Sequence, residues 1–174
     1  MKNHHNNIVL IGFMGSGKTS VGTKLARAFS YQFLDTDALI EQHARKSIAQ
    51  IFEEDGEEAF RQMEVEELRK LKHNCKDAII STGGGMPMRE EARMLLREMG
   101  TVILLRASKE VTLERLAGDT TRPLLSGDEM EQKIGSLLEK RMPYYEEAAH
   151  AVIDTDGKSF YEIINEVEKI MKHA

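Results

Sequence analysis

A glycine-rich segment near the N-terminus has the residue types that bind phosphate groups. The segment GFMGSGKTS, residues 12–20, matches the pattern G-x-x-x-x-G-K-S/T through Gly12, Gly17, Lys18 and Thr19. Glycines let the backbone turn tightly and direct its N–H groups inward, and the start of a helix adds a favourable potential for an anion. Lys18 can reach the β- and γ-phosphates of a nucleotide, and the Thr19 hydroxyl can bind Mg²⁺. An apolar run precedes the segment and a helical pattern follows it, so it predicts a nucleotide site rather than a plain turn.

Two aspartates separated by one residue follow the next apolar run. If FLDTD, residues 33–37, is a strand, Asp35 and Asp37 point to the same side. Like charges this close raise the cost of ionising both, unless a cation or hydrogen bonds offset it. Phosphate-binding segments are usually paired with an aspartate that closes a later strand, but the run Ala78–Thr82 leads into TGGG, which has no acid. We therefore expect one aspartate of FLDTD to serve the Mg²⁺.

Three glycines and three arginines are further candidates for ligand contacts. Gly83–Gly85 have no side chains, so a ligand could approach their backbone closely, although a plain turn is the alternative. An arginine binds carboxylates or phosphates through its planar fork, but a single arginine more often forms a surface ion pair. The arginines are Arg61 in AFRQME, Arg122 in TTRPLL and Arg141 in EKRMPYY.

Arg122 lies within a long loop bounded by glycine and proline, LAGDTTRPLLSGD, residues 116–128. Polar loops of this length in a compact domain are usually functional. An arginine in such a loop can close over the transferring phosphoryl group and help to exclude water. We expect residues 116–128 to form a lid.

The elements that position these residues alternate along the chain. Short apolar runs predict strands, and amphipathic stretches between them predict helices, among them one after Lys18, one from about Ile48 with Ser47 and Gln50 as a capping box, and one from Phe160. This alternation predicts an α/β fold with an open parallel sheet and helices on both faces, whose carboxyl edge gathers the three candidate segments. The predicted strands are Ile8–Gly12, Gln32–Asp35, Ala78–Thr82, Thr101–Leu105 and Ala151–Asp154.

Size and composition limit the class of protein. The 174 residues, 1–174, fit one domain, and the net charge of −5 argues against general nucleic-acid binding. Cys75 is the only cysteine, and a small buried side chain is its expected role. No signal peptide or membrane span is visible, so we expect a cytoplasmic protein, with a monomer as the default. His4 and His5 are expected to lie in a solvated tail.

Taken together, the motifs resemble the shikimate kinase family from Ile8 to about Met171. The resemblance rests on GFMGSGKTSVG, FLDTD, SIAQIFEEDGEEAFRQMEVEEL, STGGG, TRPLL and KRMPYY, which occur in order and at family-like spacing. It implies a P-loop kinase fold with a five-stranded parallel sheet in the order 2-3-1-4-5. It also implies transfer of the ATP γ-phosphate to the 3-hydroxyl of shikimate, with Mg²⁺, in the synthesis of aromatic amino acids.

The resemblance also implies roles for individual residues. Asp35 would support the Mg²⁺ bound by Thr19 through water, and Asp37 would bind shikimate hydroxyls and help to activate the attacking oxygen. Arg61 and Arg141 would grip the shikimate carboxylate, and residues 38–73 would form a substrate-binding helical region. The remaining substrate contacts would come from Gly83, Gly84 and Gly85, with Phe52 and Phe60 either as an apolar wall or as plain core. The ATP contacts would come from Gly15, Ser16, Gly17, Lys18, Thr19, Ser20, Arg115, Arg122 and, in the loop 154–158, Lys158.

Other functions remain as alternatives. The phosphate-binding segment alone is compatible with a GTPase, a motor, a transporter ATPase or a small-molecule kinase. A gluconate kinase would share the segment but has no evident need for LDTD, GGG and both arginines together. A non-catalytic binding module predicts loss of Lys18, Asp37 or the lid arginine, and all three are present. A nucleotide switch that binds a protein partner would give the DTD and GGG segments no function.

Overall fold

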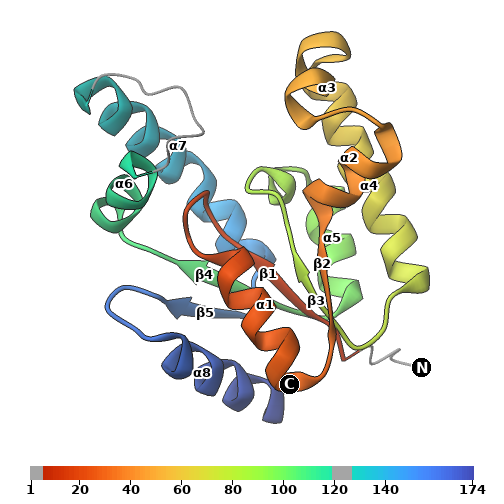
Figure 1. Cartoon of the computed structure of the whole chain (residues 1–174), viewed down its shortest axis with the longest axis vertical. Coiled ribbons are helices and arrows are strands. Elements are labelled where there is room, and N and C mark those ends of the chain that lie inside the picture. Colours follow the sequence, from red (N-terminus) through yellow and green to blue (C-terminus); the bar gives the residue numbers. More distant parts are fainter. Residues whose placement is uncertain (1–5, 119–126) are drawn as a thin grey trace.

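The structure is a computed structural model, which describes residues 6–118 and 127–174 (Figure 1). The predictions for His4, His5 and Arg122 lie outside the described residues. Helices cover both faces of one sheet, and a group of three helices extends beyond one of its edges (Figure 1). No helix in the described part of the chain combines the length and the apolar character needed to cross a membrane.

Five parallel strands of the described chain form one sheet in the order β2-β3-β1-β4-β5, as the family resemblance implied. Three strand ends differ by one residue from the sequence prediction. β1 stops before Gly12, whose φ of +152° is unusual for a strand, β3 stops before Thr82, and β4 continues to Arg106, which pairs with Asp154 of β5. The strands are β1 Ile8–Ile11, β2 Gln32–Asp35, β3 Ala78–Ser81, β4 Thr101–Arg106 and β5 Ala151–Asp154.

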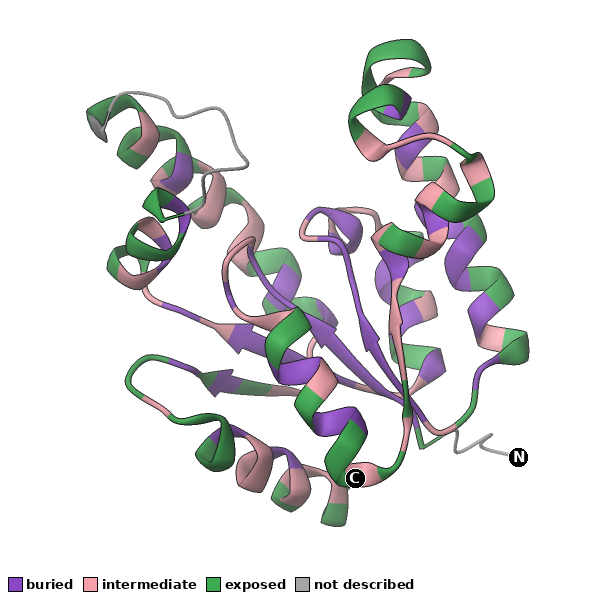
Figure 2. Cartoon of the chain, viewed as in Figure 1, coloured by how far each residue is buried: buried purple, intermediate pink, exposed green. Residues whose placement is uncertain are grey.

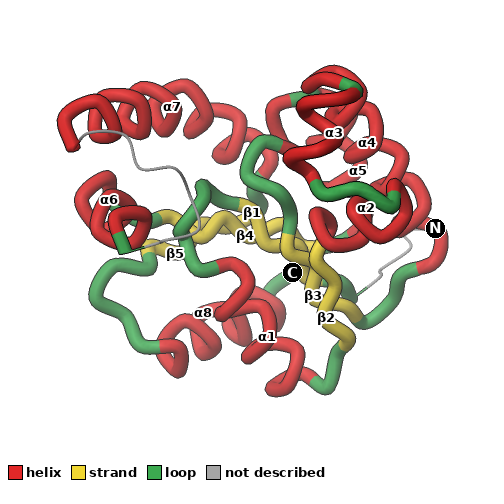
Figure 3. Tube along the Cα trace, turned by 45° about the horizontal axis from the view of Figure 1, so that its top comes forward, coloured by secondary structure: helices red, strands yellow, loops and turns green. Residues whose placement is uncertain are grey.

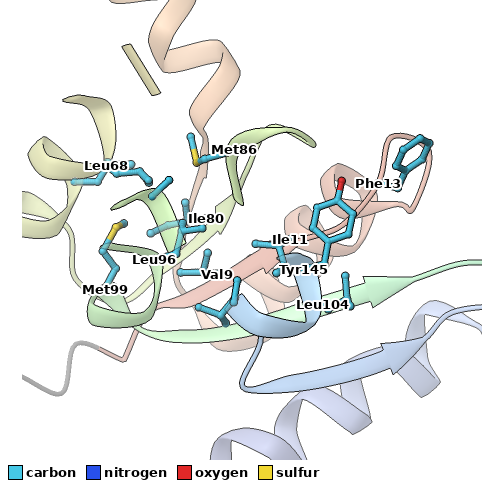
Figure 4. Packing of buried hydrophobic residues seen from close by; sticks show 14 of the residues in the cluster. Val9, Ile11, Phe13, Leu68, Ile80, Met86, Leu96, Met99, Leu104 and Tyr145 are labelled. Atoms are coloured by element: carbon cyan, nitrogen blue, oxygen red, sulfur yellow. The ribbon is translucent and has the colours of Figure 1, made fainter. Parts of the chain in front are cut away.

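The strands are apolar because helices bury both faces of the sheet (Figure 3). The helices are α1 Lys18–Phe29, α2 Thr36–Ala44, α3 Ile48–Glu54, α4 Gly56–Asn74, α5 Glu90–Met99, α6 Lys109–Ala117, α7 Gly127–Ala148 and α8 Phe160–Lys172, with a short 3₁₀ helix η1 at Met86–Met88. Side chains alternate along β1, so Ile8 and Leu10 pack with α1 and α8, whereas Val9 and Ile11 pack with α4, α5 and α7 (Figure 4).

Local sequence signals set several helix starts. Ser47 and Gln50 form the predicted capping box of α3, in which each side chain accepts a hydrogen bond from the other residue's backbone N–H. Ser159 and Glu162 form a second capping box at α8, which was not predicted. α1 begins after Gly17, whose φ of +91° suits glycine. The start of α1 places the phosphate-binding segment at the carboxyl edge of the sheet.

The helices α2, α3 and α4 extend beyond the strands β2 and β3 (Figure 1). They have a small hydrophobic core of their own, made by Ile40, Ile51 and Phe60, each at most 4% exposed. Their outward faces are largely exposed (Figure 2). The position of Asp37 on α2 relative to Arg61 on α4 therefore depends on packing among these three helices as well as on the main sheet.

Candidate active site

The site is built around the loop that follows β3. The Gly83 N–H donates a hydrogen bond to the Thr36 hydroxyl at 3.1 Å, which ties this loop to the start of α2. A Cβ added to Gly83 would lie 2.6 Å from Asp37 Oδ1. A Cβ on Gly84 would lie 3.4 Å from Arg141 and 3.7 Å from the Gly12 carbonyl, and one on Gly85 would lie 2.4 Å from Arg61. The three glycines thus let side chains from three helices and the first loop approach one another.

The phosphate-binding segment wraps around the start of α1 as its sequence predicts. Lys18 Nζ donates hydrogen bonds to the carbonyls of Gly12 at 2.7 Å and Phe13 at 3.0 Å. A Cβ on Gly12 would lie 2.5 Å from the Leu105 carbonyl, so only glycine fits there. Gly17 forms the N-cap of α1 without a side-chain hydrogen bond, and Thr19 and Ser20 are exposed in the first turn. The first-turn N–H groups of a helix suit a phosphate ligand.

The two aspartates of FLDTD have different positions. β2 ends at Asp35, whose Oδ1 accepts a hydrogen bond from the Ala38 N–H at 3.1 Å and so caps α2. Asp37 lies in the first turn of α2 rather than on the strand. Its Oδ1 is buried and has no hydrogen-bond partner among the described residues. Burial raises the pKa of the Asp37 carboxyl and the charge of Asp35 raises it further, while Lys18 opposes both effects.

The predicted arginine pair approaches the glycine loop from two helices. Arg61 of α4 is largely buried, with a side chain that is 14% exposed, and its Nη1 donates to Glu64 Oε2 at 2.8 Å. Arg141 of α7 lies with its guanidinium 5.7 Å from the centre of the Phe13 ring. The Arg141 guanidinium lies beside Gly84 and the Arg61 guanidinium lies beside Gly85, close to where a Cβ atom on each glycine would be. Two buried or half-buried guanidiniums at one loop provide a binding place for an anionic group such as a carboxylate.

Glu64 belongs to this cluster but was missed by the sequence interpretation. It is 2% exposed, and its Oε1 has no hydrogen-bond partner in the described part of the chain. Burial raises the pKa of the Glu64 carboxyl to about 7, although the hydrogen bond and charge of Arg61 act in the opposite direction. A signal was present in the sequence, because Glu64 interrupts the apolar stripe of α4 midway between Phe60 and Leu68. An acid on a buried stripe usually has a partner or a function.

Tyr145 is a second residue that the sequence interpretation missed. Its side chain is fully buried, and its hydroxyl donates a hydrogen bond of 2.5 Å to the Gly84 carbonyl. Burial raises the pKa of the Tyr145 hydroxyl, so it remains a donor. Since Arg141 lies one helical turn earlier on α7, this helix holds both the loop backbone and one of the guanidiniums.

The predicted nucleotide-side residues are less closely grouped. Arg115 of α6 is exposed and donates a hydrogen bond to the Gly15 carbonyl at 2.9 Å, which brings it to the phosphate-binding segment. Lys158 instead forms an ion pair with Glu166 of α8 at 2.6 Å. The carboxylate of Asp156, in the same loop, accepts from the Ser108 N–H at 3.1 Å. The loop 154–158 is therefore held to the start of α6.

Phe52 and Phe60, expected to form either an apolar wall or plain core, differ in how far they are buried. The rings of Phe52 and Phe60 lie 4.8 Å apart. Phe60 is 4% exposed and packs in the small core of α2, α3 and α4, whereas Phe52 is 39% exposed. The Arg61 guanidinium lies 5.3 Å from the centre of the Phe60 ring, so Phe60 supports the side chain that reaches the loop.

The residues at the sheet edge fit Mg²⁺ better than a metal that needs a protein cage. Among the described residues, no group of three or more His, Cys, Asp or Glu side chains could hold a metal ion. Mg²⁺ commonly takes only one or two oxygen ligands from protein and completes its shell with phosphate and water. The Thr19 hydroxyl at the start of α1 and the Asp35 carboxylate at the end of β2 offer such oxygens.

Comparisons with known proteins agree with the motifs. The family model for shikimate kinase matches residues 14–172. A shikimate kinase from Thermodesulfovibrio yellowstonii is 46% identical over 166 residues, which cover 95% of this chain and 93% of the relative. The structure of a shikimate kinase from Acinetobacter baumannii in complex with shikimate aligns with a TM-score of 0.87 and 35% identity, over 99% of this chain and 95% of that one. A gluconokinase structure from Sinorhizobium meliloti aligns with a TM-score of 0.58 at 19% identity over 97% of this chain and 93% of that one, a likeness of fold alone.

The surroundings of Glu64 predict an unusual titration. In the free protein, the Glu64 carboxyl should lose its proton at about pH 7 rather than near its ordinary value of 4.5, because burial disfavours the charged form. Arg61→Leu should raise this pKa further, since the guanidinium favours the ionised carboxyl. ¹³C NMR of the glutamate side-chain carboxyls would follow the titration, and Glu64→Gln would assign the signal. A Glu64 signal that titrates near pH 4.5 would contradict the burial of this group.

Proposed function

Because the chain belongs to the shikimate kinase family, we propose that the cluster around Gly83–Gly85 is its active site. The function of the chain is ATP-dependent phosphoryl transfer to an alcohol group of shikimate, the activity of that family. One observation supports the location most strongly. Asp37, Arg61, Arg141 and the first loop all approach the same short run of glycines. Catalysis of phosphoryl transfer needs this kind of close positioning of donor, acceptor and charge.

The phosphate-binding segment would hold the ATP phosphates. The backbone N–H groups of residues 15–20 and the Lys18 ammonium favour the negative charge of the β- and γ-phosphates. Thr19 and Asp35 would hold Mg²⁺, which neutralises charge on the phosphates when it is bound. Lys18 would exchange its contacts with the Gly12 and Phe13 carbonyls for contacts with phosphate oxygens. Arg115, which already contacts Gly15, would extend the site on the nucleotide side.

Asp37 would orient the acceptor hydroxyl and take its proton. The partnerless Oδ1 is the oxygen that lies beside Gly83, so it can accept a hydrogen bond from a hydroxyl placed there. A raised pKa makes the carboxylate a better base at neutral pH than an ordinary aspartate. Arg61 and Arg141 would hold the shikimate carboxylate, which fixes the ring relative to Asp37. The 3-hydroxyl is then the acceptor.

Two larger segments complete the proposal. Residues 38–73 would form the substrate-binding region, because α2 carries Asp37 immediately before this region and α4 carries Arg61 within it. Residues 116–128 would form a lid with Arg122 placed to stabilise the transferring phosphoryl group, a role that rests on the family resemblance. Arg122 lies outside the described residues. Lys158 would contact the nucleotide only if it left Glu166.

The proposal extends to the state of the protein in the cell. A single buried cysteine suits a reducing compartment, and ATP is a cytoplasmic substrate, so we place the chain in the cytoplasm. We propose a monomer as the default state of the chain.

The choice of acceptor is the direct test. ADP release should be measured with MgATP and with shikimate, quinate or gluconate offered separately. We expect ADP release to depend on shikimate. ADP release with gluconate but not with shikimate would identify the protein as a kinase of the alternative class, and binding without ADP release from any acceptor would favour a non-catalytic module.

The arginine pair generates a prediction about substrate grip. Arg61→Ala and Arg141→Ala should each raise the KM for shikimate about 10- to 100-fold with little change for ATP, because each removes charge-assisted hydrogen bonds worth about 1.5–3 kcal/mol. Lysine should restore only part of the loss, since an ammonium cannot present the planar fork. Arg69→Ala is a matched control on the exposed side of α4. Unchanged shikimate kinetics in both site variants would place the carboxylate elsewhere.

The two aspartates should fail in different ways. Asparagine keeps the shape and, at position 35, the helix cap, but removes the charge. Asp35→Asn should raise the Mg²⁺ concentration needed for activity, and excess metal should restore part of the rate. Asp37→Asn should bind MgATP almost normally but lose phosphoryl transfer at every Mg²⁺ concentration. Measuring the rate and nucleotide binding of both variants as Mg²⁺ is titrated distinguishes the two roles. If excess Mg²⁺ restored Asp37→Asn but not Asp35→Asn, the assignment would be reversed.

A further inference from the structure

The two oxygens of the Glu64 carboxylate have different surroundings. Oε2 accepts the hydrogen bond from Arg61, whereas Oε1 is buried and partnerless among the described residues. Oε1 lies 3.2 Å from the position of a Cβ on Gly83, and Asp37 Oδ1 lies 2.6 Å from the same position. Two buried carboxylate oxygens without partners therefore lie beside one glycine. A buried carboxylate is costly unless it is paired or protonated.

The charged groups that face Glu64 come from three helices. Asp37 from α2 disfavours its ionised form, and Arg61 from α4 and Arg141 from α7 favour it. The loop after β3 contributes Gly83, which carries no charge. Arg61 is the cation that Glu64 contacts directly, at 2.8 Å. Burial has the largest effect on the pKa of Glu64, and Arg61 is the cation that most strongly favours its ionised form.

The proposed substrate competes for this same guanidinium. If Arg61 turns its hydrogen bonds toward the carboxylate of shikimate, Glu64 loses its closest cation, and a third carboxylate joins the cluster. An ionised Glu64 would then be a buried charge without a full partner beside Asp37, which is an unfavourable arrangement. Protonation of Glu64 removes that charge.

We propose that Glu64 takes up one proton from solvent when shikimate binds, and so releases Arg61 to the shikimate carboxylate. This inference rests on the proposed function, because it needs shikimate in the cluster around Gly83–Gly85. It assigns Glu64 as a positioning residue that acts through Arg61. Glu64 exchanges its charge for that of the substrate, so the buried cluster keeps the same net charge before and after shikimate binds.

The coupling makes shikimate affinity depend on pH in one direction. The pKa of Glu64 in the free protein is about 7. The bound state holds more protons than the free state above that pH, so affinity should fall as pH rises, by up to about tenfold per pH unit. Below about pH 6 most Glu64 is already protonated, and the affinity should become independent of this group.

Calorimetry can count the proton directly. Shikimate is titrated into the nucleotide-free chain at pH 6 and pH 8, each in buffers that differ in ionisation enthalpy, and the dependence of the measured heat on that enthalpy gives the protons taken up. Nucleotide is left out because its phosphates titrate in this range. We expect an uptake that approaches one proton at pH 8 and is small at pH 6. Glu64→Gln, which mimics the neutral carboxyl, should show no uptake at pH 8 and an affinity that is similar at both pH values.

Glu67→Gln is the matched control. Glu67 is another buried glutamate of α4, 3% exposed, but its partner is His43 and it lies away from the glycine loop. This variant should keep the proton uptake of the unaltered chain. If Glu64→Gln does not fold, the unaltered chain still tests the coupling, because an absence of proton uptake at pH 8 would overturn it.

The outcomes separate the coupling from the function. Shikimate binding at pH 8 without proton uptake would overturn the coupling and leave the proposed function intact. Proton uptake that persists in Glu64→Gln would assign the proton to another group and would also overturn the proposed coupling. A chain that neither binds shikimate nor releases ADP with it would instead overturn the proposed function.

Discussion

The site depends on the absence of side chains at Gly83 and Gly85. A methyl group at Gly83 would collide with Asp37, and one at Gly85 would collide with Arg61. The backbone of this loop is also fixed from two sides, by the Thr36 hydroxyl at the Gly83 N–H and by the Tyr145 hydroxyl at the Gly84 carbonyl. These bonds hold the loop in place while the missing side chains leave room for charged groups. A rigid loop with open space is what allows three helices to present their side chains at one point.

Charge is distributed over separate elements around that loop. The carboxylates come from α2 and α4 and the guanidiniums from α4 and α7, so no single helix carries a complete set. Within the cluster, Arg61 and Glu64 form an ion pair at 2.8 Å. Lys18 adds a positive charge from the start of α1 and opposes the effect of Asp35 on Asp37. The packing that sets the spacing of these helices therefore also sets the electrostatics of the site.

The sequence predicted the fold and most of the candidate site because these depend on local patterns. Continuous apolar runs such as Ile79–Ile80 signal a sheet buried on both faces, and the glycines around Lys18 are required by backbone geometry. The strand order came from the family resemblance, because periodicity alone does not determine it. Glu64 and Tyr145 were missed, since their importance comes from burial against partners far away in the chain. The capping role of Asp35 was missed because the sequence interpretation assigned its carboxylate to the Mg²⁺, although the strand was correctly predicted to end at Asp35.

The hydrogen bond between Tyr145 and Gly84 has a mechanical consequence for α7. The helix runs from Gly127 to this buried contact, a distance of about 27 Å for 18 residues. A rotation of about 5° around the contact would displace the first turn of α7 by about 2 Å, but would move Arg141, one turn away, by only about 0.5 Å. The contact thus holds the C-terminal part of α7 beside Gly84. A displacement of about 2 Å at the N-terminal end of α7 would leave the position of Arg141 nearly unchanged.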